Sequence, residues 1–262
     1  MWQYACGRAL AIQHGVQLKL DLKWFMPGRR FFMLHYFDID AGFMTSRDLL
    51  ELKTVKEKRE PGYKLQILSE DNVYLDGYWQ NIGFIKSAEN IIRKDFVLMV
   101  RLRKHSVEYL EIVNRCKCPV SVHVRRGDYL KGDNASLFAE MTPLYYETAV
   151  NSLQKIYEGI TLFIFSNDIS WCKKELHFHC PVYYVEGNDE AHGFEDLYLM
   201  SQCHHHIIAN SSFSWWGAWL NQNPQKVVLA PEYYFKSMDG EYGAFNSDWL
   251  PEGWQKISCG HI

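Results

Sequence analysis

Two adjacent arginines near the middle of the chain have the side chains best suited to bind phosphate. They lie in H-V-R-R-G-D, residues 123–128, directly after an apolar run typical of a buried strand. A guanidinium presents a rigid fork of donors that matches phosphate oxygens and stays charged at any working pH. Such a group can neutralise the charge that grows on a departing nucleoside diphosphate without a metal. The alternative, which applies mainly to Arg126, is an ion pair with Asp128 that closes a turn.

A second segment, N-S-S-F-S-W-W-G-A-W at residues 210–219, also follows an apolar run. Serines between a strand and a helix cap the helix. They also expose backbone N–H groups and hydroxyls to an anion, which the helix dipole favours. Capping alone is the alternative for each serine. We predict that Trp215, Trp216 and Trp219 lie in the core.

A third segment, F-S-N-D at residues 165–168, follows another expected strand. Asp168 is suited either to cap a helix or to accept hydrogen bonds from a nucleoside, and both interpretations stay open.

Three other patterns are weaker indications of chemistry. Asp38 and Asp40 form a D-x-D pattern that could hold a metal with a diphosphate, but it is common by chance and follows no clear strand. The histidines at 204–206 are consecutive and so do not share a helix face; we expect them in the last turn of a helix, where they complement its dipole. The chain has no G-x-x-x-x-G-K-[ST] loop, which argues against kinase or NTPase chemistry.

Composition indicates a globular protein and narrows its class. The 262 residues suit one large domain or two small ones, and 47% are hydrophobic and 23% charged. A formal net charge of −3 gives no sign of a nucleic-acid binder. The seven cysteines are odd in number and irregularly spaced, which predicts reduced thiols. We see no signal peptide and no apolar stretch of about 18 residues, and expect a cytoplasmic protein that could lie peripherally at the inner face of the membrane.

The elements that position these segments alternate along the second half of the chain. Apolar runs at 120–124, 162–165, 182–185, 207–209 and 227–230 predict strands, and residues 194–203 and 211–220 predict helices. This alternation is typical of a buried parallel sheet. Ligands of such sheets bind beyond the carboxyl ends of the strands, where all three segments lie.

The first half reads as a smaller α/β lobe. A helix is expected over residues 1–12, a strand over 16–21 and a mostly helical stretch over 86–105. Residues 31–37 form a further apolar run, and residues 73–75 lead into 77–80. We place the boundary between residues 116 and 117, which gives domains 1–116 and 117–262.

The segments together resemble the bacterial α-1,2-fucosyltransferases of glycosyltransferase family 11. Residues 123–128 match the family's H-x-R-R-x-D box, and residues 211–219 match its S-S-F-S-W-W-G-A-W box. F-S-N-D at 165–168 and D-G-Y-W-Q at 76–80 match two further elements. The resemblance covers nearly the whole chain and implies a GT-B-like α/β fold of two Rossmann-type lobes facing a cleft.

Membership would imply that the C-terminal lobe binds GDP-fucose and the N-terminal lobe faces the acceptor. Fucose would pass, with inversion and no metal or other cofactor, to the 2-hydroxyl of a galactose residue in an oligosaccharide. The partners would be GDP-fucose and a galactose-terminated acceptor, with no nucleic acid and no transmembrane segment. The alternatives are another nucleotide sugar as donor, or a truncated member that binds GDP without efficient turnover.

The resemblance also implies roles for single residues. Arg125 would bind the β-phosphate and help GDP leave, with Arg126 beside it at the donor. His123 and Asp168 would lie near the guanosine. The nucleotide cleft would be lined by Ser211, Ser212 and Phe213. Asp133 is the first candidate for the catalytic base, and Asp128 is its competitor.

The start of the chain departs from the family pattern. Family members usually begin with a strand and G-G-L-G-N-Q before M-F-Q-Y-A, whereas this sequence begins at that methionine, with Trp2 in place of phenylalanine. We therefore expect an N-terminal lobe without its first strand and glycine-rich loop. A chain with such a lobe would transfer fucose weakly and aggregate readily, and it would retain GDP binding.

Overall fold

The computed structural model describes residues 1–25, 30–48, 52–58, 65, 72–236 and 249–259. The chain divides into two compact units, residues 1–100 with 246–251 and residues 101–245 with 252–262. The boundary expected between residues 116 and 117 falls after helix α3 (Lys104–Arg115). Helix α3 packs against α7 (Gly193–Gln202) and therefore groups with the second unit.

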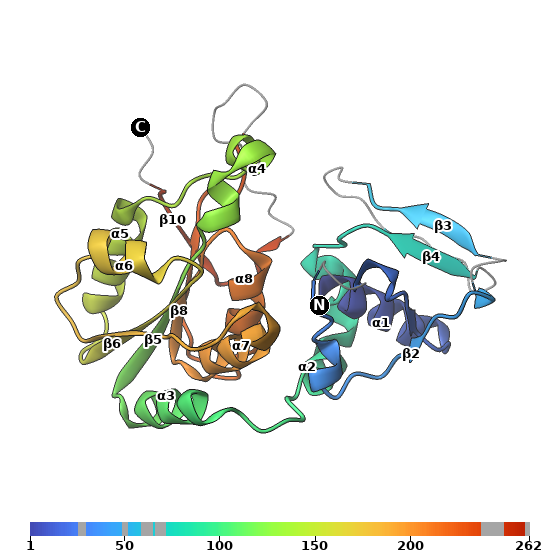
Figure 1. Cartoon of the computed structure of the whole chain (residues 1–262), viewed down its shortest axis with the longest axis horizontal. Helices are drawn as coiled ribbons and strands as arrows, with labels where there is room; N and C mark the ends of the chain where they lie inside the picture. Colours follow the sequence, from blue (N-terminus) through green and yellow to red (C-terminus); the bar gives the residue numbers. More distant parts are fainter. Residues whose placement is uncertain (26–29, 49–51, 59–64, 66–71, 237–248, 260–262) are drawn as a thin grey trace. The chain divides into compact units, whose positions relative to one another are not determined.

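The second unit is built on a parallel sheet with the strand order β10-β9-β8-β5-β6-β7 (Figure 1). Its strands are β5 (Cys118–Val124), β6 (Ile160–Ser166), β7 (Val182–Tyr184), β8 (His205–Ile207), β9 (Val228–Pro231) and β10 (Gln255–Ile257). Five of them were expected from apolar runs. Four of these five, β5, β6, β8 and β9, are inner strands, which a parallel sheet buries on both faces. Strand β10 is a largely exposed edge strand with no such run, and it was not predicted from the sequence.

Helices cover both faces of this sheet (Figure 1). Helices α5 (Pro143–Gln154) and α6 (Ile169–Glu175) pack on the face that carries Val120, Val122 and Val124. On the other face, which carries Phe163 and Phe165, lie α3, α7 and α8 (Ser212–Leu220). Short α4 (Gly132–Leu137) follows the loop after β5. The α/β architecture predicted for this half is confirmed.

The histidine run lies in a strand, which corrects the expected helix end. His205 and His206 belong to β8, where the backbone N–H of His206 donates to the carbonyl of Val227 at 2.9 Å. The His206 ring is buried, and its Nδ1 lies 2.7 Å from the hydroxyl of Ser121 on β5. Pairing between strands therefore determines that His205 and His206 are extended, and helix α7 ends before them, at Gln202.

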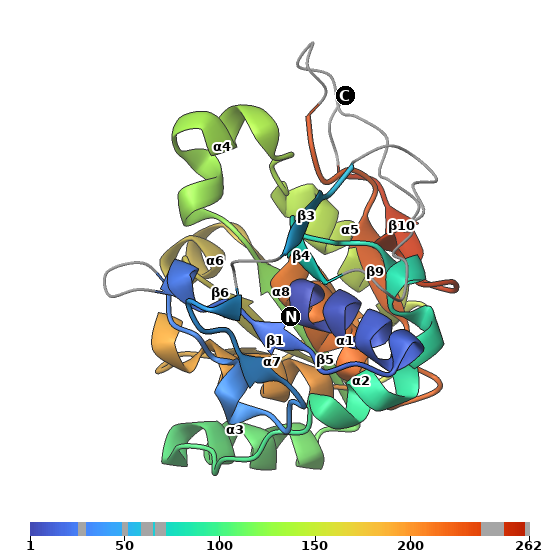
Figure 2. The same ribbon diagram turned by 90° about the vertical axis from the view of Figure 1, so that its right-hand side faces the viewer.

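The first unit combines helices with two small parallel sheets (Figure 2). Its elements are α1 (Trp2–His14), β1 (Lys19–Leu20), β2 (Gly42–Phe43), β3 (Lys53–Lys56), β4 (Val73–Asp76) and α2 (Glu89–Asp95). The expected helix at the start of the chain is confirmed as α1. The strand expected over residues 16–21 is shorter in the structure, where residues 19–20 form β1 and pair with β2.

The helical stretch expected over 86–105 is interrupted. Helix α2 ends at Asp95 and α3 begins at Lys104. Between them the backbone N–H of Asp38 donates to Val97, and that of Met99 to Tyr36, which holds residues 97–99 extended. Pairing with residues 36–38 therefore overrides the helical pattern there.

The D-G-Y-W-Q element is fixed by one carboxylate of the first unit. Glu57 accepts hydrogen bonds from the backbone N–H groups of Tyr78 (2.9 Å) and Trp79 (2.8 Å). A Cβ on Gly77 would lie 2.4 Å from the Cβ of Glu57, so the approach requires glycine. Trp79 is fully buried with φ +57°, a conformation that is costly for a non-glycine residue. The motif is therefore a turn held against β3 that anchors a core tryptophan.

No helix in the described ranges is long and apolar enough to cross a membrane.

Candidate functional site

The three predicted segments meet at one edge of the sheet in the second unit. Strands β8, β5 and β6 are adjacent and parallel, so their carboxyl ends lie side by side. Val124 is paired with Ser166 at the last register position of β5 and β6. The arginine, F-S-N-D and serine segments follow β5, β6 and β8 in turn. This is the edge at which parallel sheets bind ligands.

Arg125 lies at the end of β5 with its guanidinium partly exposed. Its Nη2 lies 2.8 Å from the carboxylate of Asp128, and its guanidinium is 5.2 Å from the ring centre of Tyr129. The Nε atom is buried without a hydrogen-bond partner. The ion pair with Asp128 was considered for both arginines and mainly for Arg126, and the structure forms it with Arg125. Arg125 therefore combines one ion pair within its own turn with a partly exposed guanidinium at the sheet edge.

Arg126 has different surroundings. Its guanidinium lies 3.9 Å from the ring centre of Trp171 on α6 and forms a 3.0 Å ion pair with Glu140. Asp168 lies 4.0 Å from its Nε, and the side chain is 13% exposed. A stacked and paired guanidinium fixes the turn that it belongs to.

The structure brings together His123, predicted to lie near the guanosine, and Phe213, predicted to line the nucleotide cleft. Their ring centres are 5.6 Å apart, and His123 is 5% exposed. Its Nδ1 is buried without a hydrogen-bond partner. Burial, with a smaller contribution from the charge of Arg125, lowers the pKa of His123 to about 3. His123 is therefore neutral at physiological pH and presents an uncharged imidazole beside the sheet edge.

The serine segment forms the start of α8. Ser211 is the N-cap, and its hydroxyl accepts from the backbone N–H of Phe213 at 3.3 Å. Ser212 and Phe213 are half-buried in the first turn, where the helix dipole favours an anion. The tryptophans Trp215, Trp216 and Trp219 are buried, which confirms their predicted place in the core.

Asp168 caps the neighbouring helix. Its Oδ1 accepts from the backbone N–H of Trp171 at 3.1 Å, which makes it the N-cap of α6. The capping interpretation is confirmed, and contact with a nucleoside stays a prediction.

The two candidate bases lie on successive short elements. Asp128 is in the 3-10 turn 127–130, with its carboxylate on Arg125, and its carbonyl accepts from Asn134 Nδ2 at 3.2 Å. Asp133 lies in the first turn of α4 with its side chain exposed. The ring of Tyr129 stacks on that of Phe138 at 3.9 Å, which ties the two elements together.

The D-x-D pattern of the first unit has a structural role. Asp40 pairs with Arg8 at 2.6 Å, and Arg8 also contacts Asp95 at 3.0 Å. Within the described residues, no three His, Cys, Asp or Glu side chains come together to hold a metal ion.

A partly buried polar cluster near the same sheet edge was not predicted from the sequence. Asn188, after β7, donates to Asp196 on α7 at 2.5 Å, and Glu195 pairs with Arg103 at 3.0 Å. The pKa of Asp196 is raised to about 6, mainly because burial disfavours the charged carboxylate. The available signal was the pair of consecutive acids in the first turn of a predicted helix.

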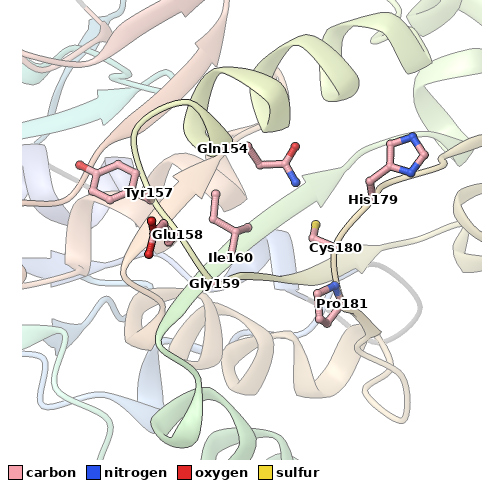
Figure 3. A pocket seen from close by; sticks show the side chains of 8 residues that line it. All are labelled: Gln154, Tyr157, Glu158, Gly159, Ile160, His179, Cys180 and Pro181. Atoms are coloured by element: carbon pink, nitrogen blue, oxygen red, sulfur yellow. The ribbon is translucent and has the colours of Figure 1, made fainter.

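A hollow of about 390 Å³ lies at the opposite end of the strands (Figure 3). It is lined by residues 154, 157–160 and 179–181, at the starts of β6 and β7. None of the predicted site residues lines it.

The chain is similar in sequence to known glycosyltransferases. Residues 26–253 match Glycosyl transferase family 11. An alpha-1,2-colitosyltransferase of Escherichia coli is 31% identical over 98% of this chain and 94% of its own length. The O-antigen biosynthesis glycosyltransferase WbnK of Escherichia coli is 33% identical over 66% of this chain and 58% of its own. Human galactoside alpha-(1,2)-fucosyltransferase 1 is 26% identical over 86% of this chain and 67% of its own.

The fold matches solved structures of a more distant enzyme. NodZ alpha-1,6-fucosyltransferase soaked with GDP-fucose superimposes with a TM-score of 0.52, at 15% identity over 84% of this chain and 87% of that one. The same enzyme co-crystallised with GDP gives a TM-score of 0.53. The predicted GT-B-like fold is thereby confirmed. On its sequence match and its fold, this chain is a glycosyltransferase that belongs to glycosyltransferase family 11.

Proposed function

We propose that this glycosyltransferase moves fucose from GDP-fucose to the 2-hydroxyl of a galactose residue in an oligosaccharide, with inversion and without a metal ion. The observation that carries the proposal is the placement of Arg125 at the end of β5, beside the strand that leads into α8. One fork of donors and one helix N-terminus at the same sheet edge suit a diphosphate. The names of NodZ and of the human relative support fucose as the sugar.

The chemistry would be a single displacement. A base takes the proton of the acceptor hydroxyl while its oxygen forms a bond to the anomeric carbon and the bond to the GDP oxygen breaks. Negative charge grows on the leaving β-phosphate, where the Arg125 guanidinium would exchange its contact with Asp128 for phosphate oxygens. A neutral His123 beside Phe213 would complete the wall of the nucleotide cleft.

Asp133 is our first candidate for the base and Asp128 the second. The exposed carboxylate of Asp133 is open to an acceptor hydroxyl, whereas that of Asp128 lies on Arg125. If donor binding draws Arg125 away, the carboxylate of Asp128 is released and becomes a competitor. Positioned base catalysis contributes roughly 10²- to 10⁴-fold to the rate.

A second donor is favoured by one specific observation. The E. coli relative that matches 98% of this chain is named as a colitosyltransferase. Colitose is fucose without its 3-hydroxyl, so the same phosphate-binding groups would serve both donors. A further alternative is a chain that binds GDP without efficient turnover.

The test is a glycan-product assay with lactose or N-acetyllactosamine as the acceptor. GDP-fucose and nucleotide-activated colitose are supplied separately, and GDP binding is measured by calorimetry on the same preparation. We expect a fucosylated product, and loss of that product with Arg125→Ala. Product from the colitose donor alone would replace our donor assignment. GDP binding without product from either donor would favour the binding-only alternative.

A further inference from the structure

Both backbone polar groups of Arg126 are bound by one side chain from the neighbouring strand. The Oδ1 of Asn167 accepts from the Arg126 N–H at 2.9 Å, and its Nδ2 donates to the Arg126 carbonyl at 3.3 Å. Asn167 directly follows β6, whose last paired residue, Ser166, faces Val124. The amide of Asn167 therefore continues the ladder between β5 and β6 past the point where both strands end.

The glycine of the arginine segment makes room for this side chain. Gly127 has φ +57°, in the left-handed region that glycine favours. A Cβ at this position would lie 2.5 Å from the Nδ2 of Asn167, a separation that real Cβ atoms do not reach. The position of the Asn167 side chain therefore requires that residue 127 has no Cβ.

We propose that Asn167 is a positioning residue that holds the arginine loop at the end of β5, so that Arg125 presents its guanidinium to the donor phosphate. The proposal rests on the proposed function, in which Arg125 binds that phosphate. Asn167 acts through the backbone of Arg126, one residue beyond Arg125. Both polar atoms of the Asn167 side chain form hydrogen bonds with that backbone. Donors fixed in advance stabilise a developing charge because they need no rearrangement during the reaction.

The kinetic test compares Asn167→Ala and Asn167→Asp with the native chain. Asp keeps the size and one acceptor, but it sets a carboxylate oxygen against the Arg126 carbonyl, so neither variant restores the contact. We expect kcat to fall by up to about 100-fold, as a misplacement of about 1 Å can cause, while the KM for the acceptor stays unchanged. Asn151→Ala, at an exposed position on α5, is the matched control and should leave both constants unchanged. An unchanged kcat for Asn167→Ala would overturn the proposal.

A double-mutant cycle with Gly127→Ala separates positioning from general damage. In the native background the added methyl collides with the Asn167 amide, and in the Asn167→Ala background only the strain at φ +57° remains. We therefore expect Gly127→Ala to reduce kcat by a smaller factor in the second background, because residues in contact are not additive. Equal factors in the two backgrounds would overturn the coupling.

Hydrogen exchange at the Arg126 amide tests the contact independently of any activity. In Asn167→Ala this amide loses its acceptor, so its exchange should accelerate while the melting temperature stays near that of the native chain. If the native chain does not transfer fucose, the proposed function fails and the exchange rate still decides whether Asn167 holds the loop. If the native chain transfers fucose and the Arg126 amide exchanges at the same rate in the native chain and in Asn167→Ala, Asn167 does not hold the arginine loop. The proposed function then stands.

Discussion

The guanidinium of Arg126 stacks on the indole of Trp171, 3.9 Å from its ring centre. Together with Glu140 and Asp168, this contact incorporates Arg126 into the packing between the β5 loop and α6. Arg125, its neighbour in sequence, pairs with one carboxylate within its own turn, and its guanidinium lies 5.2 Å from the ring centre of Tyr129. Two identical side chains therefore have different tasks, and the donor-binding role given to both in the sequence interpretation stays a prediction for each.

Replacing Arg125 should abolish measurable transfer. Losing one preorganised donor to a developing charge costs roughly 10²- to 10³-fold. Arg125→Lys should not rescue the rate, because a point charge cannot replace a bidentate fork. Initial rates with GDP-fucose measure both variants, with Arg115→Lys on the exposed face of α3 as the control. A near-native rate for Arg125→Lys would refute the phosphate assignment.

Replacing Arg126 should lower stability more than replacing Arg125 does. Arg126→Lys loses the planar stacking on Trp171, which is worth about 0.5–2 kcal/mol, whereas Arg125→Lys leaves that packing intact. Urea unfolding of the two variants measures the free energy of unfolding of each. The expectation fails if both lysine variants are equally stable.

Chelation should leave transfer intact. The proposed mechanism stabilises the departing diphosphate with Arg125 and the α8 N-terminus, so excess EDTA should not lower the rate. Product formation is compared with and without the chelator, and then with manganese added back. A strict manganese requirement would contradict the metal-free mechanism.

Asp133→Asn should lower the transfer rate far more than it weakens GDP binding. A base acts on the acceptor hydroxyl and not on the nucleotide, and its removal is worth roughly 10²- to 10⁴-fold. Asp128→Asn is the paired variant, and calorimetry with GDP supplies the binding measurement. Loss of activity in Asp128→Asn, with Asp133→Asn silent, would transfer the role to Asp128.

Acid should destabilise the second unit partly through His123. Burial lowers its pKa from the ordinary 6.5 to about 3, so the folded chain excludes a proton that the unfolded chain accepts. The stability from this residue is complete above about pH 6.5 and is lost as pH falls towards 3, by about 1.4 kcal/mol for each pH unit. Buried His206 has its pKa lowered in the same direction and adds to the effect.

The check on this acid effect is the slope of unfolding free energy against pH, measured for the native chain and His123→Asn. The variant should have the shallower slope between pH 6.5 and the acid transition. Identical slopes would show that His123 does not bind the proton on unfolding. Comparing slopes keeps the result independent of the variant's absolute stability.

The sequence by itself determined most of the second unit. Its inner strands appear as apolar runs because a parallel sheet buries both faces of each strand. The polar segments after β5, β6 and β8 were identified as candidate ligand-binding segments because ligands of parallel sheets bind beyond the carboxyl ends of the strands. The three core tryptophans of α8 and the helix at the start of the chain were likewise readable from local pattern.

The tertiary structure alone decided which partners the site residues have. Asp128 pairs with Arg125 and not with Arg126. The guanidinium of Arg126 instead stacks on Trp171 and forms an ion pair with Glu140. Histidines 205–206 lie in a strand and residues 97–99 are extended, since pairing with remote segments outweighs local preference. The contact of Asn167 with Arg126 spans 41 residues of sequence. Periodicity reports which face of an element is buried, but a hydrogen bond between two loops depends on where separate strands end relative to each other.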